Sequence, residues 1–214
     1  MKRLTAFAAL MATTPAFAHH PLAGQEMSTF WHGLLSGIGH PLLGFDHLFF
    51  VALVGIAAVY TGRALAAPLA YVGATLVGCV LMTFGLALPA IEPAIALSLL
   101  ILGYIVLSGR ALGLAAAMAL FALAGVFHGS AFGEAMASAE AGAAGVVLTG
   151  YLLGLGLLQY GICVLMGQVA VRVWKATEST AIHARLAGAV VAGVGLFLSL
   201  EVVEGLAFAA LGVS

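Results

Sequence analysis

The stretch SGIGHPLLGFDHLFFVALVGIAAVY, residues 36–60, places two histidines and an aspartate directly before a long apolar run. His40, Asp46 and His47 come first, and no further charged residue occurs until Arg63. An apolar run of this length favours a helix in lipid. Ionisable groups are costly within a membrane span and mark functional sites when they occur there. The stretch therefore predicts a transmembrane helix with a functional site of ionisable side chains at its beginning.

The composition of the whole chain is that of an integral membrane protein. Of its 214 residues, 64% are hydrophobic and 7% are charged, whereas soluble domains carry about 25% charged residues. A chain with so few charges cannot cover a water-facing surface, so we expect it to lie in a lipid bilayer. The net charge of −1 gives no indication of a nucleic-acid partner.

Residues 1–18 have the pattern of a secretory signal peptide. Two basic residues at positions 2 and 3 precede an apolar stretch, and Ala-Phe-Ala at 16–18 is an A-x-A cleavage signature. An uncleaved first helix is the alternative, but the shortness of the stretch and its small-residue ending favour cleavage. The mature chain would then begin outside the cytoplasm with His19 and His20.

Charged residues are so rare that they divide the mature chain into apolar runs. Since a span needs about 20 residues, the runs predict six transmembrane helices. We expect them at roughly 41–61, 65–88, 92–109, 112–133, 143–172 and 184–208. A segment at roughly 28–38, with Trp31 and His32, is too short to span, so we expect it to lie at the interface or to re-enter. The predicted fold class is all-α integral membrane, with one six-helix domain over residues 19–214.

The basic residues orient the predicted helices. If the mature N-terminus lies outside, all five fall in loops on the cytoplasmic side: Arg63, Arg110, Arg172, Lys175 and Arg185. This distribution follows the positive-inside rule, and the signal peptide independently places the N-terminus outside. We therefore expect a multi-pass protein of a bacterial inner membrane with both mature termini in the periplasm. Most carboxylates and imidazoles would then face the periplasm.

His40, Asp46 and His47 combine imidazole and carboxylate groups, which are ligands for divalent metals such as Ni, Co, Zn or Fe. Pro41 suits the first position of a helix, which would place Asp46 about a turn and a half inside it. His40 and His47 would share a face if this helix extended back to residue 40. A helix N-terminus alone favours an anion, but the added carboxylate and imidazoles favour a cation.

A second cluster, FHGSAFGE at 127–134, lies near the outer end of the fourth predicted helix. It contains His128 within the span and Glu134 near the membrane surface. Gly129 and Gly133 have the spacing that lets two helices approach closely. We interpret His128 and Glu134 as metal ligands. The alternatives are a hydrogen-bonded interior histidine and a solvated charge at a helix end.

The secondary ligand candidates lie near the predicted outer surface. Glu201 and Glu204 are three residues apart and share one face of the last helix, although solvation of a helix end would also account for them. His32 lies in the short segment. His19 and His20 would stand beside the new amino terminus, or form part of a tail without a metal.

HPLLGFDH at 40–47 and FHGSAFGE at 127–134 resemble the two signature segments of the HupE/UreJ family. These are small bacterial membrane proteins associated with nickel or cobalt uptake for hydrogenase and urease. The resemblance extends over essentially the whole chain, and it implies a permease whose substrate is Ni²⁺ or Co²⁺, with no fixed cofactor. It also implies a link to the maturation of those metalloenzymes. Its metal-handling residues would be His40, Asp46, His47, His128 and Glu134.

The sequence has no G-x-x-x-x-G-K-[ST] motif for ATP hydrolysis, so we expect a secondary or facilitated permease rather than an enzyme. An intramembrane zinc hydrolase is an alternative, because Ser36, His40 and Asp46 loosely resemble the S-x-x-x-H plus Asp of the ceramidase group. The late H-x-x-x-H of that group is missing. A metal-sensing membrane protein that does not transport is the other alternative.

Overall fold

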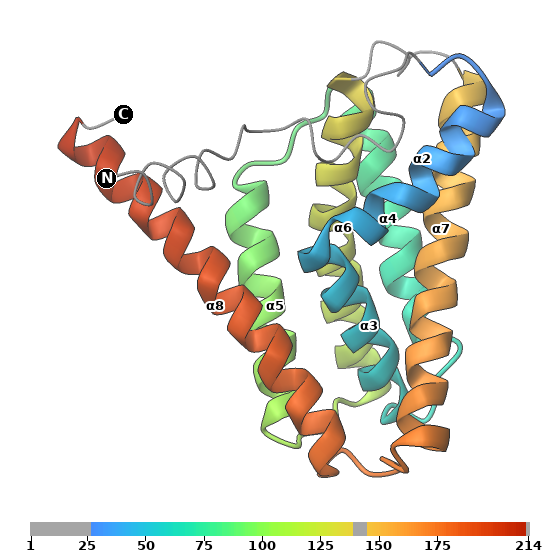
Figure 1. The fold of residues 1–214 in the computed structure, drawn as a ribbon, viewed down its shortest axis with the longest axis vertical. Coiled ribbons are helices and arrows are strands. Elements are labelled where there is room, and N and C mark those ends of the chain that lie inside the picture. The colour runs from blue at the N-terminus through green and yellow to red at the C-terminus, as the bar shows by residue number, and fades with distance from the viewer. Residues whose placement is uncertain (1–26, 139–144, 213–214) are drawn as a thin grey trace, which may run out of the picture.

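The computed structural model describes residues 27–138 and 145–212, and every regular element in these ranges is a helix (Figure 1). The all-α prediction is confirmed. The predicted signal peptide, with His19 and His20, lies outside the described residues. The helices are α2 (Phe30–Leu43), α3 (Phe45–Val59), α4 (Ala67–Thr83), α5 (Ile91–Leu107), α6 (Leu114–Ser138), α7 (Gly145–Gln168), the π-helical turn η2 (Val169–Val173) and α8 (Ile182–Leu211).

The long apolar helices identify a multi-pass membrane protein. Three helical stretches are long and apolar enough to cross a membrane, at Leu114–Glu134, Gly145–Val173 and Ile182–Leu211. The pair α2 and α3 passes the same test together and is bent by 85° at its break. Helices α4 and α5 are apolar but shorter, with 17 residues each. The six predicted spans correspond in order to α3 through α8, and their number as true spans stays a prediction.

The predicted start of a helix at residue 41 is wrong. Helix α2 continues through Pro41 to Leu43, and α3 begins only at Phe45. Pro41 lacks the N–H group that would bond within its helix. Gly44 then takes an extended conformation, with ψ of 94°, and its N–H donates to the His40 carbonyl at 3.1 Å. The segment predicted at 28–38 is thus the first part of a longer α2, and the chain bends at Gly44.

Glycines bring the backbones of α4 and α6 into direct contact. A Cβ atom added to Gly129 of α6 would collide with the carbonyl oxygen of Thr75 in α4, and one added to Gly78 of α4 would collide with that of Val126. The pairs α2–α7 and α5–α8 are built in the same way, through Gly33, Gly37, Gly150 and Gly154 and through Gly103, Gly188 and Gly195. Small residues permit such close helix packing in membranes.

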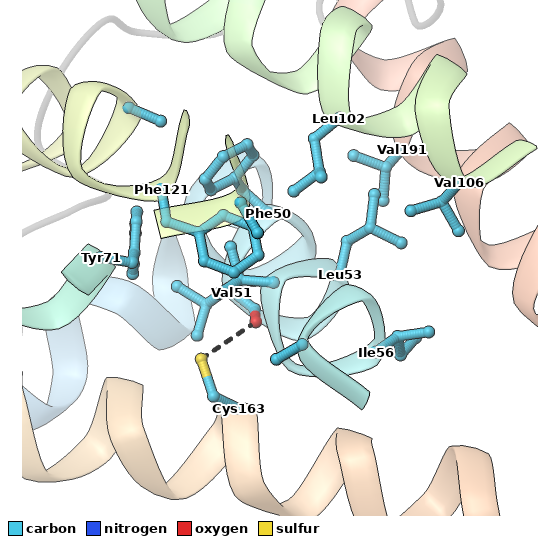
Figure 2. Packing of buried hydrophobic residues seen from close by; sticks show 14 of the residues in the cluster. Phe50, Val51, Leu53, Ile56, Tyr71, Leu102, Val106, Phe121, Cys163 and Val191 are labelled. Atoms are coloured by element: carbon cyan, nitrogen blue, oxygen red, sulfur yellow. Dashed lines mark hydrogen bonds between the residues drawn. The ribbon is translucent and has the colours of Figure 1, made fainter. Parts of the chain in front are cut away.

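Helix α3 lies at the centre of these pairs. Its residues Phe50, Val51, Leu53 and Val54 are at most 1% exposed. Figure 2 shows them in one apolar cluster that also includes side chains of the surrounding helices. The Cys163 thiol of α7 donates to the Val51 carbonyl at 3.3 Å, so α7 is fixed against α3 at this level.

The two ends of the bundle carry opposite charges. The turns after α3 and α5 and the α7–α8 connection lie at one end (Figure 1), where the Ser179 hydroxyl donates to the Gly109 carbonyl at 2.8 Å. We call this the basic end, because it holds the five lysines and arginines of the described residues: Arg63, Arg110, Arg172, Lys175 and Arg185. The opposite, acidic end carries Glu92, Glu134, Glu201 and Glu204. This separation is what the predicted topology requires.

The glycine contacts give a first prediction. Gly129→Ala is expected to lower the free energy of unfolding by about 1–3 kcal/mol, because its Cβ has no room against Thr75 and the helices must separate. Thermal unfolding of the purified protein in detergent would measure this loss. Gly161→Ala is the control, since nothing lies within 4 Å of the added Cβ. Equal unfolding midpoints for the two variants would contradict the prediction.

Candidate functional site

The break at Gly44 places three predicted ligands at the junction of two half-helices. His40 lies in the last turn of α2, and Asp46 lies in the first turn of α3. His40 and His47 therefore do not share one helix, because α3 does not extend back to residue 40, which was the condition for a shared face. Asp46 is in the first turn rather than a turn and a half inside, because the helix begins at Phe45.

The junction lies part-way along the bundle. Helix α3 has 15 residues, which at about 1.5 Å per residue is shorter than the roughly 30 Å hydrocarbon core of a bilayer. Figure 1 shows α2 running obliquely from the acidic end towards the middle of the bundle, from where α3 continues to the basic end. The predicted site thus lies inside the bundle rather than at its outer mouth.

His47 and His128 form a direct pair between α3 and α6. Their Nδ1 atoms are 2.8 Å apart, and the two residues are only 9% and 0% exposed. The hydroxyl oxygen of Ser98 in α5 lies 2.9 Å from His128 Nε2. A chain of polar groups therefore connects three helices in the apolar interior.

One tautomer of each histidine follows when the Ser98 hydroxyl keeps its bond to the Ile95 carbonyl. The Ser98 hydroxyl donates its single proton to the Ile95 carbonyl at 2.7 Å, so it accepts a hydrogen bond from Nε2–H of His128. Neutral His128 then has an unprotonated Nδ1, which accepts from Nδ1–H of His47. Neutral His47 consequently carries its lone pair on Nε2, which is the nitrogen that can bind a metal ion.

Asp46 lies beside that nitrogen. Its Oδ2 is 3.8 Å from His47 Nε2, which is too long for a hydrogen bond. Because a transition-metal ion forms bonds of about 2.1 Å to imidazole nitrogen and carboxylate oxygen, it fits between two atoms at this separation. The Asp46 side chain is 30% exposed, so water reaches the carboxylate.

Aromatic rings hold the histidine pair in place. Phe50 stacks on His128 with ring centroids 4.5 Å apart, and Tyr71 meets the same ring edge-on at 5.8 Å. Phe132 lies 4.5 Å from the His47 ring. These contacts restrict the imidazole orientations and keep the surroundings at low dielectric, where charge interactions are strong.

His40 has a different environment from the pair. Its Nδ1 lies 3.1 Å from the Tyr151 hydroxyl of α7, and its ring meets Phe132 edge-on at 5.4 Å. The Tyr151 hydroxyl also donates to the Phe132 carbonyl at 3.3 Å. His40 thus connects α2 to α6 and α7. Phe132 contacts both His40 and His47.

The remaining predicted ligands lie away from the pair. Glu134 is exposed and lies six residues beyond His128 on α6, which is about 9 Å towards the acidic end. His32 lies in the first turn of α2, where its Nδ1 accepts from the Ser28 N–H at 3.3 Å. Glu204 is exposed on α8.

A cavity of about 570 Å³ connects Asp46 with carboxylates of two other helices. It is lined by Asp46, by Glu92 of α5 and by Glu201 of α8, together with apolar residues of α5 and α8. Glu201 is one of the secondary ligands expected from the sequence, whereas Glu92 is not. The side chains of Ser98 and Tyr151 were also missed, because a hydroxyl in an apolar run gives no indication of its distant partner.

Within residues 27–138 and 145–212, no group of three or more His, Cys, Asp or Glu side chains lies close enough together to hold a metal ion. The structure joins Asp46 to His47 and His47 to His128 as pairs. It does not bring Glu134 or His40 into the same group. The five-residue ligand set therefore stays a prediction, and a closed cage of three histidines, as in a zinc hydrolase, is not favoured.

Comparisons with known proteins agree on one family. The family model described as HupE / UreJ protein matches residues 7–198. Protein HupE of Rhizobium leguminosarum bv. viciae is 32% identical over 194 residues, which cover 85% of this chain and 99% of that protein. No solved structure matches the chain.

The proton arrangement gives a second prediction. Ser98→Ala removes the acceptor of the His128 Nε2–H group, and an unpaired buried donor costs about 1–3 kcal/mol. Thermal unfolding in detergent is expected to show a loss of that size. Ser199→Ala is the matched control, because the Ser199 hydroxyl bonds only to the Gly195 carbonyl of its own helix. A loss no larger than that of the control would contradict the assigned hydrogen bond.

Proposed function

Since the chain belongs to the HupE/UreJ family, we propose that it is a permease that carries a divalent transition-metal ion, Ni²⁺ or Co²⁺, across the inner membrane of a bacterium. The observation that carries the proposal is the chain of Asp46, His47 and His128 at a helix break inside the bundle. Discontinuous helices form substrate sites near the bilayer midplane in several transporter folds.

The acidic end supplies the entry to this site. Asp46, Glu92 and Glu201 line one cavity, and a recess lined by charges of one sign raises the local concentration of the opposite ion. A metal cation from the periplasm is attracted into the cavity and meets Asp46 at its inner side. The five basic residues at the opposite end mark the cytoplasmic side.

The site then binds the ion through nitrogen and oxygen. The lone pair on His47 Nε2 and the Asp46 carboxylate are ligands that suit Ni²⁺ and Co²⁺, and retained water completes the coordination. A conducting site must bind strongly enough for the ion to enter and weakly enough for it to leave. Two protein ligands with water meet this requirement better than a closed cage would.

The membrane potential is sufficient to drive uptake. A unit charge gains about 2.3 kcal/mol per 100 mV, so a divalent cation that moves inward gains about 4.6 kcal/mol, or roughly three decades of concentration. Transport therefore needs no ATP. The imported metal would serve the maturation of a metalloenzyme such as hydrogenase or urease. In this proposal the mature chain follows a cleaved signal peptide and forms six spans with both termini in the periplasm.

Metal uptake tests the proposal directly. Wild-type protein in liposomes is expected to take up radioactive nickel, and Asp46→Asn, His47→Ala and His128→Ala are each expected to lower the rate by about tenfold or more, because each removes a ligand or its hydrogen-bond partner. His183→Ala is the control, since His183 is exposed at the basic end. Cobalt and zinc as competitors would show the metal preference.

Two results would count against the proposal. Wild-type uptake no higher than that of empty liposomes would show that this chain alone does not transport nickel. Uptake that survives in all three site variants, with the proteins folded and inserted, would show that the ion takes another route.

The driving force is a separate prediction. The steady-state ratio of internal to external Ni²⁺ is expected to rise about tenfold for each 30 mV of inside-negative potential, because two charges cross with each ion. Potassium diffusion potentials set with valinomycin would provide the series of voltages. A ratio that follows an imposed proton gradient and ignores the potential would instead indicate proton coupling.

A further inference from the structure

Two buried side chains in the core lack the partners that polar groups need. Gln159 of α7 is 0% exposed, and neither its amide oxygen nor its amide nitrogen has a hydrogen-bond partner in the described part of the chain. The hydroxyl of Tyr71 in α4, also 0% exposed, has none either. Buried polar groups are nearly always paired, and an unpaired one costs free energy, so such a group calls for an explanation.

Packing places Gln159 where α3, α4 and α7 meet, and it places the Tyr71 ring of α4 against Phe50 of α3. Gln159 lies between Gly156, which faces Leu76 and Val72 of α4, and Cys163, which contacts Gly55 of α3. Tyr71 precedes Val72 on α4 and belongs to the same apolar cluster as Cys163 (Figure 2).

The level of the two residues follows from the neighbouring helices. On α7, Gln159 lies eight residues nearer the basic end than Tyr151, which bonds to the Phe132 carbonyl. On α6, Gly125 lies seven residues nearer the basic end than Phe132. Gly125 packs on the Tyr71 backbone, so Tyr71 lies at the level of Gly125. His128 lies between these two levels. Tyr71 and Gln159 are thus about one helical turn closer to the basic end than His128.

Other hydroxyl groups in this region donate hydrogen bonds to carbonyls of their own helices. The Thr75 hydroxyl donates to the Tyr71 carbonyl at 2.9 Å, and the Ser130 hydroxyl donates to the Val126 carbonyl at 2.9 Å. Gln159 has no such bond, and a leucine of similar volume would fill its place without leaving two polar atoms unpaired. The buried amide therefore has no local structural explanation.

We propose that Tyr71 and Gln159 form a second, uncharged position for the transported ion and its remaining water ligands, one helical turn beyond the His47–His128 pair on the way to the basic end. This inference rests on the proposed function. The amide and phenol oxygens bind the cation or its waters, and because no carboxylate belongs to the position, the ion is held weakly and moves on. Two successive positions of unequal strength allow an ion both to enter and to leave.

The Gln159→Leu variant tests the second position independently of the Asp46–His47 site. The variant is expected to be at least as stable as the wild type, because the leucine leaves no polar atom unpaired. Its nickel affinity, measured by titration calorimetry on purified protein, is expected to stay within about twofold, whereas its nickel uptake in liposomes falls by about tenfold, since the ion loses a ligand along its path. Tyr71→Phe, which removes only the hydroxyl, is expected to lower uptake in the same direction.

The control is Gln168→Leu, the same change at an exposed position near the end of α7, and it is expected to transport like the wild type. Uptake by Gln159→Leu equal to that of the control would overturn the inference, as would loss of nickel binding together with uptake. If Gln159→Leu fails to fold, nickel affinity and nickel uptake of the Gln159→Met and Tyr71→Phe variants test the inference in its place. Failure of the wild type to take up nickel would instead refute the proposed function.

Discussion

The break of the helix at Gly44 is the constraint on which the rest of the structure depends. In lipid, every backbone amide and carbonyl must find a partner within the protein, so irregular backbone at membrane depth must be enclosed by protein. Here α2 and α3 change direction by 85°, and the backbone at the bend is satisfied locally, because the Gly44 N–H donates to the His40 carbonyl and the Leu48 N–H donates to the Gly44 carbonyl. The glycine contacts of α2 with α7 and of α4 with α6 allow the helices around the bend to pack closely. A Cβ atom at Gly44 itself would lie only 3.0 Å from the His47 ring.

The polar chemistry occupies the space that this bend creates. One side of the junction holds His40 against Tyr151, and the other holds the pair of His47 and His128. Each imidazole has a hydrogen-bond partner from another helix, so the same contacts that satisfy the buried nitrogens also fix the arrangement of the helices. Asp46, at one end of this row of polar groups, borders the cavity of about 570 Å³ that Glu92 and Glu201 also line, and this connects the row with the acidic end.

Much of the fold was predictable from the sequence, because rare charges separate the apolar runs, with the basic residues at one end of the bundle and most of the acidic residues at the other. The position of the bend was not. Pro41 is a common first residue of a helix, so it suggested a start, whereas the chain bends three residues later at Gly44. The sequence identified Asp46, His47 and His128 but not their partner Ser98. Helices that face lipid are apolar on all sides, so their periodicity does not reveal which face meets which neighbour. Glu92 is exposed, and nothing in the local sequence relates it to Asp46.

The unequal helix lengths have a consequence for the surrounding bilayer. Helices α4 and α5 have 17 residues each, which is about 25 Å at 1.5 Å per residue, whereas α8 has 30 residues and leans away from the others (Figure 1). A short hydrophobic stretch draws the two lipid leaflets together locally, and a long one tilts. Where α4 and α5 cross a bilayer, the lipid beside each of them has to be thinner than the lipid beside α8.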